Sequence, residues 1–458
     1  MKPDHRPGRR GRFLPLAVAL ASLAHGEIVV LNDDGAWNWL QDERALVIEN
    51  RLVVASVALG HRDPARTGHI EVTTCDLRTR QVTRATLHRE PEPGRARRWA
   101  DDHSCPALVV RPDGRLLAWY SVHGQEPVFH YRVSEHPGDA TTWRTEGRFD
   151  LGAGSRVTFP NLLHLSGENN GRGRMFAFFR GIENRLMPSW AQSEDGGDTW
   201  RAGGLLMQWP RKVTPYVKYA GNGRDAVHLA FTDGHRVDFN NAVYHAVYRD
   251  GQLHRSDAQR IATLAEGIRS PGQPTEIFRA NADSVAMISD LELDRDGRPC
   301  VAYSIQLDTR SRRPRPVGAD HRYRYARWNG TAWLDREIAF AGTETHDAPD
   351  DDCTGLIAID PQDVNVVYIS TNADPTTGAP LVSRADGRRH WEIFRGRTRD
   401  RGVSWQWEPL TRDSTADNLR PIVPAARGRP APVVWLRGTM RMPKDSAMEI
   451  VAWLPERE

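Results

Sequence analysis

Two stretches far apart in the chain repeat one short pattern that constrains the fold. Residues 193–200 read SEDGGDTW and residues 398–405 read TRDRGVSW, and both fit Ser/Thr-x-Asp-x-Gly-x-x-Trp. In such a turn the Asp side chain accepts hydrogen bonds from backbone amides, the Gly adopts a positive φ, and the Trp packs between neighbouring sheets. Residues 134–143, SEHPGDATTW, resemble a degenerate third copy. The pattern is the Asp-box of β-propeller blades, so we expect its Asp and Trp residues to mark the fold and not the chemistry.

The rest of the chain alternates short apolar runs with turns. Clear examples are VYHAVYRDGQLHR at 243–255, LELDRDGRPCVAYS at 291–304, YRYARWNGTAW at 323–333 and VVYIS at 366–370. Windows with helical periodicity are almost absent, so the sequence predicts an all-β protein. At roughly 60 residues per blade, seven blades fill the chain, and no Pro-, Gly- or Ser-rich linker divides it. We therefore predict one seven-bladed β-propeller over residues 27–458.

Residues 1–26 have the features of a secretory signal peptide, with basic residues before the apolar run FLPLAVALASLA. Removing residues 1–24 takes away five of the 62 Lys and Arg residues and one of the 59 Asp and Glu residues, which leaves 57 against 58. A neutral chain without a basic stripe argues against nucleic-acid binding. The leader is too short for a lasting membrane anchor. We expect a secreted or periplasmic monomer, in which four cysteines permit two disulfides in three connectivities.

One hairpin carries two histidines whose relative position follows from counting. Residues 101–124 read DDHSCPALVVRPDGRLLAWYSVHG, in which two apolar runs flank a Pro-Asp-Gly turn. With a three-residue loop, Arg111 pairs with Arg115, and His103 stands opposite His123 with Cβ atoms roughly 4.5–5.5 Å apart. A two-residue turn instead sends His123 to the other face. The hairpin alone leaves two interpretations, a catalytic pair or a backbone-bonding His103 with a solvated His123.

Several motifs taken together resemble one known family. They are DDHSCPA with a second His twenty positions on, TFPNLLHL at 158–165, FFRG at 178–181, PYVKY at 215–219, TDGH with NNAVYH within 232–245, and GLIAIDPQDVNVVYIST at 355–371. With the two Asp-boxes, this set resembles the BNR-repeat propeller family. That family includes seven-bladed ulvan lyases and related enzymes that cleave rhamnose linked to glucuronate. The resemblance runs from about residue 34 to 440.

The resemblance implies roles for particular residues. It places His103 and His123 in a central active-site groove as the proton-transfer residues. It matches Arg180 of FFRG to an arginine that meets the uronate carboxylate, and it gives Tyr216 a contact with substrate. The further substrate-binding candidates are Lys218, Asn161 and Tyr244.

This chain departs from the family at one informative position. Phe159 stands before Pro-Asn where the family usually has Tyr, and that Tyr is a candidate base in some relatives. The base role therefore falls to a histidine or to another tyrosine.

The residue types match the needs of β-elimination at a uronate. The enzyme must neutralise the carboxylate, remove the α proton and protonate the leaving oxygen. Arginine binds carboxylates bidentately, and histidine titrates near neutral pH, so no catalytic cofactor is required. The leading hypothesis is an exported lyase that acts on an anionic, glucuronate-containing and rhamnose-rich glycan.

Three other functions remain open on the same scaffold. One is an α-L-rhamnosidase that acts on rhamnosyl-glucuronate. Another is a non-catalytic glycan-binding propeller, since fold alone does not decide function. Sialidase chemistry is disfavoured, because the early Arg-Ile-Pro motif that it needs is missing from the sequence.

Three residues also suggest a metal site. His235 and His245, together with Cys300, offer imidazole and thiolate ligands suited to a closed structural zinc site. The resemblance to the ulvan lyases also implies such a zinc ion. Otherwise His235 is a turn residue and Cys300 a buried apolar one.

Overall fold

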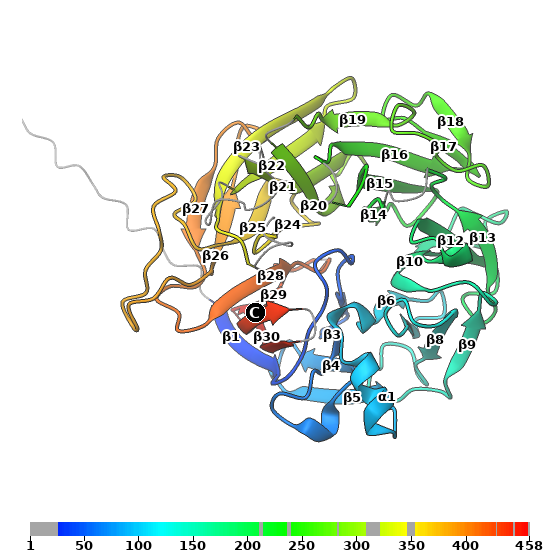
Figure 1. Ribbon diagram of the computed structural model, residues 1–458, viewed down its shortest axis with the longest axis horizontal. Coiled ribbons are helices and arrows are strands. Elements are labelled where there is room, and N and C mark those ends of the chain that lie inside the picture. The colour runs from blue at the N-terminus through cyan, green and yellow to red at the C-terminus, as the bar shows by residue number, and fades with distance from the viewer. Residues whose placement is uncertain are drawn as a thin grey trace, which may run out of the picture.

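The computed structural model describes residues 26–209, 214–235, 240–281, 284–307, 321–345, 353–426, 428–442 and 445–456. Within these residues, seven antiparallel sheets follow one another around a ring (Figure 1). The predicted all-β, seven-bladed propeller is therefore confirmed. The predicted signal peptide lies, apart from residue 26, outside the described residues and stays a prediction. Within the described ranges, no helix is long and apolar enough to cross a membrane.

The first three blades contain four strands each, paired in chain order. Blade 1 consists of β2 (Ala45–Ile48), β3 (Arg51–Val57), β4 (Ile70–Asp76) and β5 (Val82–His88). Blade 2 consists of β6 (Ala107–Val110), β7 (Leu116–Tyr120), β8 (Val128–Val133) and β9 (Gly147–Asp150). Blade 3 consists of β10 (Thr158–Leu165), β11 (Arg174–Arg180), β12 (Pro188–Ser193) and β13 (Arg201–Leu205).

Blade 4 has six strands, because β18 extends the sheet beyond β17 and β19 also pairs with β16. It consists of β14 (Val217–Gly221), β15 (Ala226–Thr232), β16 (Val243–Arg249), β17 (Gln252–His254), β18 (Arg260–Thr263) and β19 (Thr275–Phe278). Blade 5 consists of β20 (Ser284–Leu293), β21 (Pro299–Leu307), β22 (His321–Trp328) and β23 (Trp333–Gly342). Blade 6 consists of β24 (Ile357–Ile359), β25 (Val366–Thr371), β26 (Glu392–Arg397) and β27 (Gln406–Pro409).

Blade 7 combines both ends of the described chain. Its inner strands are β28 (Asp417–Ile422), β29 (Val433–Met442) and β30 (Asp445–Pro455), and its outer strand is β1 (Gly26–Asn32). Gly26 lies opposite Pro455 in the antiparallel β1–β30 ladder. This pairing closes the ring. Helical turns are short: η1 (Pro64–Arg66), α1 (Pro93–Trp99), η2 (Asp102–Ser104) and η3 (Ile182–Asn184).

The hydrophobic core lies between neighbouring blades. Strands rich in branched and aromatic residues bury both faces, as in β7, where all five residues of LLAWY are buried. The predicted Asp-box tryptophans occupy equivalent places between blades. The Trp200 ring lies 4.4 Å from that of Trp119 in blade 2, and the Trp405 ring lies 5.4 Å from that of Tyr325 in blade 5. All four cysteines are buried and free, so neither permitted disulfide forms.

The two Asp-box turns share one set of hydrogen bonds. The Asp195 carboxylate accepts from the Thr199 amide at 2.9 Å, and the Asp400 carboxylate accepts from the Ser404 amide at 2.8 Å. In each turn the indole N–H donates to the glycine carbonyl, and that glycine has a positive φ of 99° or 92°. A Cβ atom at such a φ would be strained, which explains the glycine.

The β6–β7 hairpin has the register expected for a three-residue loop. Val110 pairs with Leu116, and Ala107 pairs with Trp119. The amide of Arg111 donates to the carbonyl of Arg115 at 2.8 Å. The conditional prediction of a three-residue turn is confirmed.

Candidate active site

Two histidine rings stack face to face at the open end of the β6–β7 hairpin. His103 lies in η2, just before β6, and His123 follows β7. Their ring centroids are 3.8 Å apart, and their planes differ by 3°. His123 is the more accessible ring, with 34% of its side chain exposed against 13% for His103. The register that the turn residues predict thus brings the two side chains together.

One carboxylate binds both rings. Asp101 Oδ1 lies 2.7 Å from His103 Nδ1, and Asp101 Oδ2 lies 3.0 Å from His123 Nδ1. Asp101 is buried and also caps η2, since its side chain accepts from the His103 amide. Because each Nδ1 faces a carboxylate oxygen, each carries a proton. In both rings, therefore, Nε2 is the nitrogen that is available for proton transfer.

A second carboxylate distinguishes the two rings. Asp102 Oδ1 lies 2.7 Å from His103 Nδ1, and Asp102 Oδ2 accepts from Arg420 Nη1 at 2.9 Å. Arg420 is buried, has a left-handed backbone with φ of 56°, and lies over the Trp39 ring. The Asn38 amide nitrogen lies 3.1 Å from Nε2 and 3.4 Å from Nδ1 of His103, hence over the ring face and not in line with either nitrogen.

These neighbours give the two imidazoles opposite pKa shifts. Burial opposes the charge of His103, but Asp102 and Asp101 outweigh it and raise the pKa of His103 to about 9. Burial and the charge of His103 lower the pKa of His123. Burial likewise opposes the charge of Asp101, but both histidines hold its pKa well below the usual range. At neutral pH His103 is therefore the cation and His123 the neutral ring.

Phe159 lies at the centre of the remaining candidates. Its ring centroid is 5.0 Å from that of His103, 6.2 Å from that of His123 and 6.2 Å from that of Tyr216. The Arg180 guanidinium lies 5.4 Å from the Phe159 centroid and 4.6 Å from the Tyr216 centroid. The four predicted catalytic residues therefore surround one phenyl ring.

The backbone around Phe159 is irregular. The β10–β11 ladder shifts register between Thr158 and Asn161, and Phe159 adopts a left-handed φ of 55°. This conformation is strained for an aromatic residue. The bulge turns the Phe159 side chain toward the histidines.

Arg180 is the last residue of β11, and one hydrogen bond holds its guanidinium group. Its Nε donates to the Leu186 carbonyl at 2.9 Å. Among the described residues, no other hydrogen bond of this guanidinium is present, so both Nη groups remain available. The residue after it, Gly181, has φ of 119°, and a Cβ there would lie 1.8 Å from the Arg156 carbonyl oxygen. Only glycine fits so close to this carbonyl group, and the close contact fixes the backbone at the end of β11, next to Arg180.

The three further substrate-binding candidates have other contacts. Asn161 is buried, and its Oδ1 accepts from the Asp42 amide and from the Arg44 guanidinium. Tyr244 packs against Phe231, with ring centroids 5.8 Å apart. Neither residue lies among the ring contacts that join the four catalytic candidates.

Lys218 is buried in a narrow cavity between the innermost strands. Its Nζ donates to the Gln41 carbonyl, and burial lowers its pKa. Asp42, Glu43 and Asp290 line the same cavity. Burial raises the pKa of all three carboxyl groups, that of Asp42 to about 6. The structure thus places Lys218 within an acidic cluster.

The structure does not bring the three predicted zinc ligands together. The His235 ring lies 5.5 Å from that of Tyr216. His245 Nε2 lies 3.0 Å from His228 Nδ1, and Cys300 packs with Tyr325 in the core between blades 5 and 6. Among the described residues, these three ligand atoms are not mutually within 4.8 Å. The arrangement therefore does not fit a zinc ion held by His235, His245 and Cys300.

Other groups of described residues have the spacing for a metal ion. Besides the histidine pair with Asp101, they are His88, His130 and Glu146, and Glu43, Asp290 and Glu292. Glu146 already binds Nδ1 of His88 and Nδ1 of His130, each at 2.8 Å. Glu146 thus bridges the two histidines in an ion-pair network.

Sequence reasoning missed the carboxylates that organise the histidines. Asp101 and Asp102 directly precede His103, so the DDH run was a usable signal. Asn38 and Arg420 had no such signal, because each is far from the hairpin in sequence and only the fold brings it there.

A family model for a BNR repeat-containing family member matches residues 53–341, which is well over half of the chain. The chain belongs to the BNR repeat-containing family. The span matched to the BNR repeat-containing family includes the histidine pair, Arg180 and Tyr216. None of the curated proteins matches the chain.

Two solved structures of ulvan lyase show the same fold at low identity. A polysaccharide lyase PL25 ulvan lyase bound to GlcA(1-4)Rha3S has a TM-score of 0.65 and 14% identity, over 94% of this chain and 96% of that one. A second structure of a PL25 ulvan lyase gives a TM-score of 0.64, also at 14% identity, with the same coverage. An arabinofuranosidase from Fusarium graminearum has a TM-score of 0.43 and 13% identity, over 76% of this chain and 91% of that one.

Proposed function

We propose that this propeller is a polysaccharide lyase that cleaves a glucuronate-containing, rhamnose-rich glycan by β-elimination. The observation that carries the proposal is the stacked pair His103 and His123 on one shared carboxylate, beside the available Nη groups of Arg180. The similar fold of ulvan lyases, one of them bound to GlcA(1-4)Rha3S, supports the choice of substrate class.

We base the proposed proton-transfer roles on the two opposite pKa shifts. Arg180 binds the uronate carboxylate and stabilises the negative charge that develops there. His123, neutral and more exposed, removes the C5 proton through Nε2. The electron pair forms the C4–C5 double bond, the bond from C4 to oxygen breaks, and the imidazolium of His103 protonates the leaving oxygen. Tyr216 lies against Arg180 and borders the uronate position.

The carboxylates of the site favour elimination over hydrolysis. Glycoside hydrolysis commonly uses two carboxyl groups, one as acid and one as base or nucleophile. Here Asp101 is bound by both histidines, and Asp102 by His103 and Arg420. Neither is available for those roles, which supports a lyase over an α-L-rhamnosidase on this scaffold.

Product mass spectrometry after incubation with ulvan tests the proposal. We expect oligosaccharides that end in an unsaturated uronate, with the ultraviolet absorbance of the conjugated double bond. His103→Ala and His123→Ala should each lower kcat by roughly 10²–10⁴-fold, the usual contribution of general acid–base catalysis. His136→Ala is a matched control, because His136 is exposed and lies outside the site.

Two outcomes would overturn the proposal. Products heavier by one water, without a double bond, would indicate the rhamnosidase instead. Binding of ulvan without turnover of any uronate glycan would indicate a non-catalytic glycan-binding propeller.

A further inference from the structure

A second cavity lies in blade 6, with a volume of about 560 Å³. It is bounded by β26, β27 and the segment 374–384 that precedes β26, and none of its lining residues belongs to the histidine site. Blade 6 carries its two outer strands at the periphery of the ring (Figure 1). The cavity is within the range of volumes found for small-ligand sites.

The floor of the cavity is apolar and is built by the β26–β27 ladder. Phe394 pairs with Pro409, and Gly396 pairs with Trp407. A Cβ at position 396 would lie 2.4 Å from the indole of Trp407, so the glycine lets the ring lie across the strand. Val382, on the facing segment, is 57% exposed. The floor therefore offers an aromatic and aliphatic surface to a ligand.

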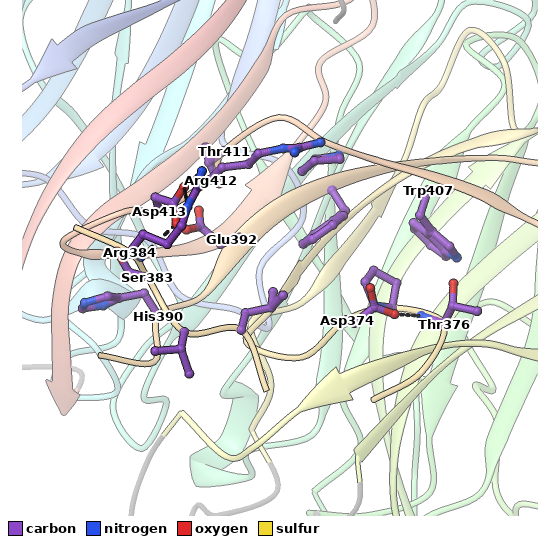
Figure 2. A pocket seen from close by; sticks show the side chains of 15 residues that line it. Asp374, Thr376, Ser383, Arg384, His390, Glu392, Trp407, Thr411, Arg412 and Asp413 are labelled. Atoms are coloured by element: carbon purple, nitrogen blue, oxygen red, sulfur yellow. Dashed lines mark hydrogen bonds and ion pairs between the residues drawn. The ribbon is translucent and has the colours of Figure 1, made fainter. Parts of the chain in front are cut away.

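The carboxylates around the rim are already bound within the protein. Asp413 accepts from Arg384 Nη2 at 2.5 Å, and Asp374 accepts from the Thr376 amide at 3.0 Å (Figure 2). Glu392 accepts from the Ser414 hydroxyl at 2.7 Å. Asp413 is therefore neutralised by Arg384, whereas Asp374 and Glu392 are held by neutral donors.

Arg412 differs from these residues. It is exposed and lines the cavity, yet its side chain has no hydrogen bond or ion pair with any described residue. The indole N–H of Trp407 also has no partner in the described part of the chain. Figure 2 shows Trp407 with Thr376 at one end of the cavity and Arg384 with Ser383 at the other. The cavity thus offers two groups without a hydrogen bond: the cation of Arg412, whose charge also acts on Asp413, and the neutral indole donor of Trp407.

We propose that this cavity is a second glycan-binding site, which takes an acidic sugar of the class that the proposed function assigns to the histidine site. The C–H face of a pyranose packs on Trp407, as sugar rings do on aromatic side chains. Its carboxylate or sulfate pairs with Arg412, and its hydroxyls face Thr376, at the same end of the cavity as Trp407. The site holds the polymer at the periphery of the enzyme and does no chemistry.

Isothermal titration of the His103→Ala protein with an uncleaved glucuronate–rhamnose oligosaccharide tests the site. We expect two binding sites per chain, and only one after Arg412→Glu is added. On the intact enzyme, Arg412→Glu should weaken retardation by the long polysaccharide in affinity electrophoresis about tenfold. Turnover of a short oligosaccharide should stay unchanged.

Arg388→Ala is the matched control, since Arg388 is an exposed arginine nearby that does not line the cavity. Trp407→Ala, checked for an unchanged melting temperature, should act like Arg412→Glu. Equal binding by Arg412→Glu and Arg388→Ala would overturn the second site and leave the lyase proposal intact. Equal affinity for a neutral oligosaccharide would overturn the acidic ligand class. Loss of binding with Arg412→Glu in a protein that makes no unsaturated product would support the site and reject the lyase.

Discussion

The two stacked imidazoles behave as one unit because Asp101 holds both of them. At a centroid separation of 3.8 Å, two imidazolium rings repel each other strongly, so the pair carries one excess proton near neutral pH. In the proposed reaction, one proton leaves His103 as another reaches His123. The charge of the pair is then the same before and after elimination. The site is ready again when the proton returns from His123 to His103.

The opposite pKa shifts predict a bell-shaped pH profile for kcat/KM. Activity needs His123 neutral, so it should fall as the pH drops through a pKa that lies below the ordinary histidine value. It also needs His103 charged, so it should fall as the pH rises through about 9. Initial rates measured across this range check the prediction. A profile that rises steadily with pH would contradict the role of His103 as the acid.

Asp101→Asn should separate the effect of this carboxylate on the pKa of His103 from its effect on the orientation and tautomer of the rings. The amide removes a negative charge from His103, so its pKa should fall and the alkaline limb of the profile should move to lower pH. We expect kcat to fall by roughly 10²–10⁴-fold as well, since the amide can place the wrong tautomer. The measurement is the pH profile of the variant, with Asp386→Asn, an exposed carboxylate, as control. An unshifted alkaline limb with low kcat would indicate a merely structural Asp101.

Among the elements, the Asp-box turns are predicted to act on stability alone. Asp195→Ala removes the acceptor for the amides of Asp198 and Thr199, which should cost about 1–3 kcal/mol of unfolding free energy. Denaturant unfolding measures the loss. Activity on a short oligosaccharide should be unchanged, because the turn lies outside the histidine site. Asp296→Ala, at an exposed turn residue, is the control.

The hairpin and the Asp-boxes could be predicted because their information is local. Turn residues set the register of β6 and β7, and that register sets the histidine contact. The bulge at Phe159 could not be predicted in the same way, since Phe before Pro-Asn does not by itself specify a left-handed φ. The contact between Asn161 and Arg44 could not be predicted either, because the two residues lie more than a hundred positions apart in the sequence.

On the scale of the whole molecule, the innermost strands gather acidic groups that oppose one another. Burial, followed by the charges of Asp290 and Glu43, raises the pKa of Glu292 well above its ordinary value. The folded state therefore binds this proton more tightly than the unfolded state does. It follows that stability declines as the pH rises through the shifted pKa.

Glu292→Gln should remove the loss of stability that rising pH causes through this carboxyl group. We expect the melting temperature of the variant to exceed that of the unchanged protein at neutral pH, with a difference that shrinks as the pH falls. Thermal melts at several pH values check this, with Glu337→Gln on the exposed face of β23 as control. A variant that melts lower at neutral pH would show that the charge of Glu292 is stabilising, as it would be with a bound cation.

Ring closure also reaches the histidine site. Arg420 reaches Asp102 only once blade 7 is in place, and blade 7 needs both β1 and β30. The contact that holds Asp102 beside His103 therefore depends on a sheet that joins the two ends of the described residues. In the proposed lyase, the orientation of His103 is thus tied to closure of the ring.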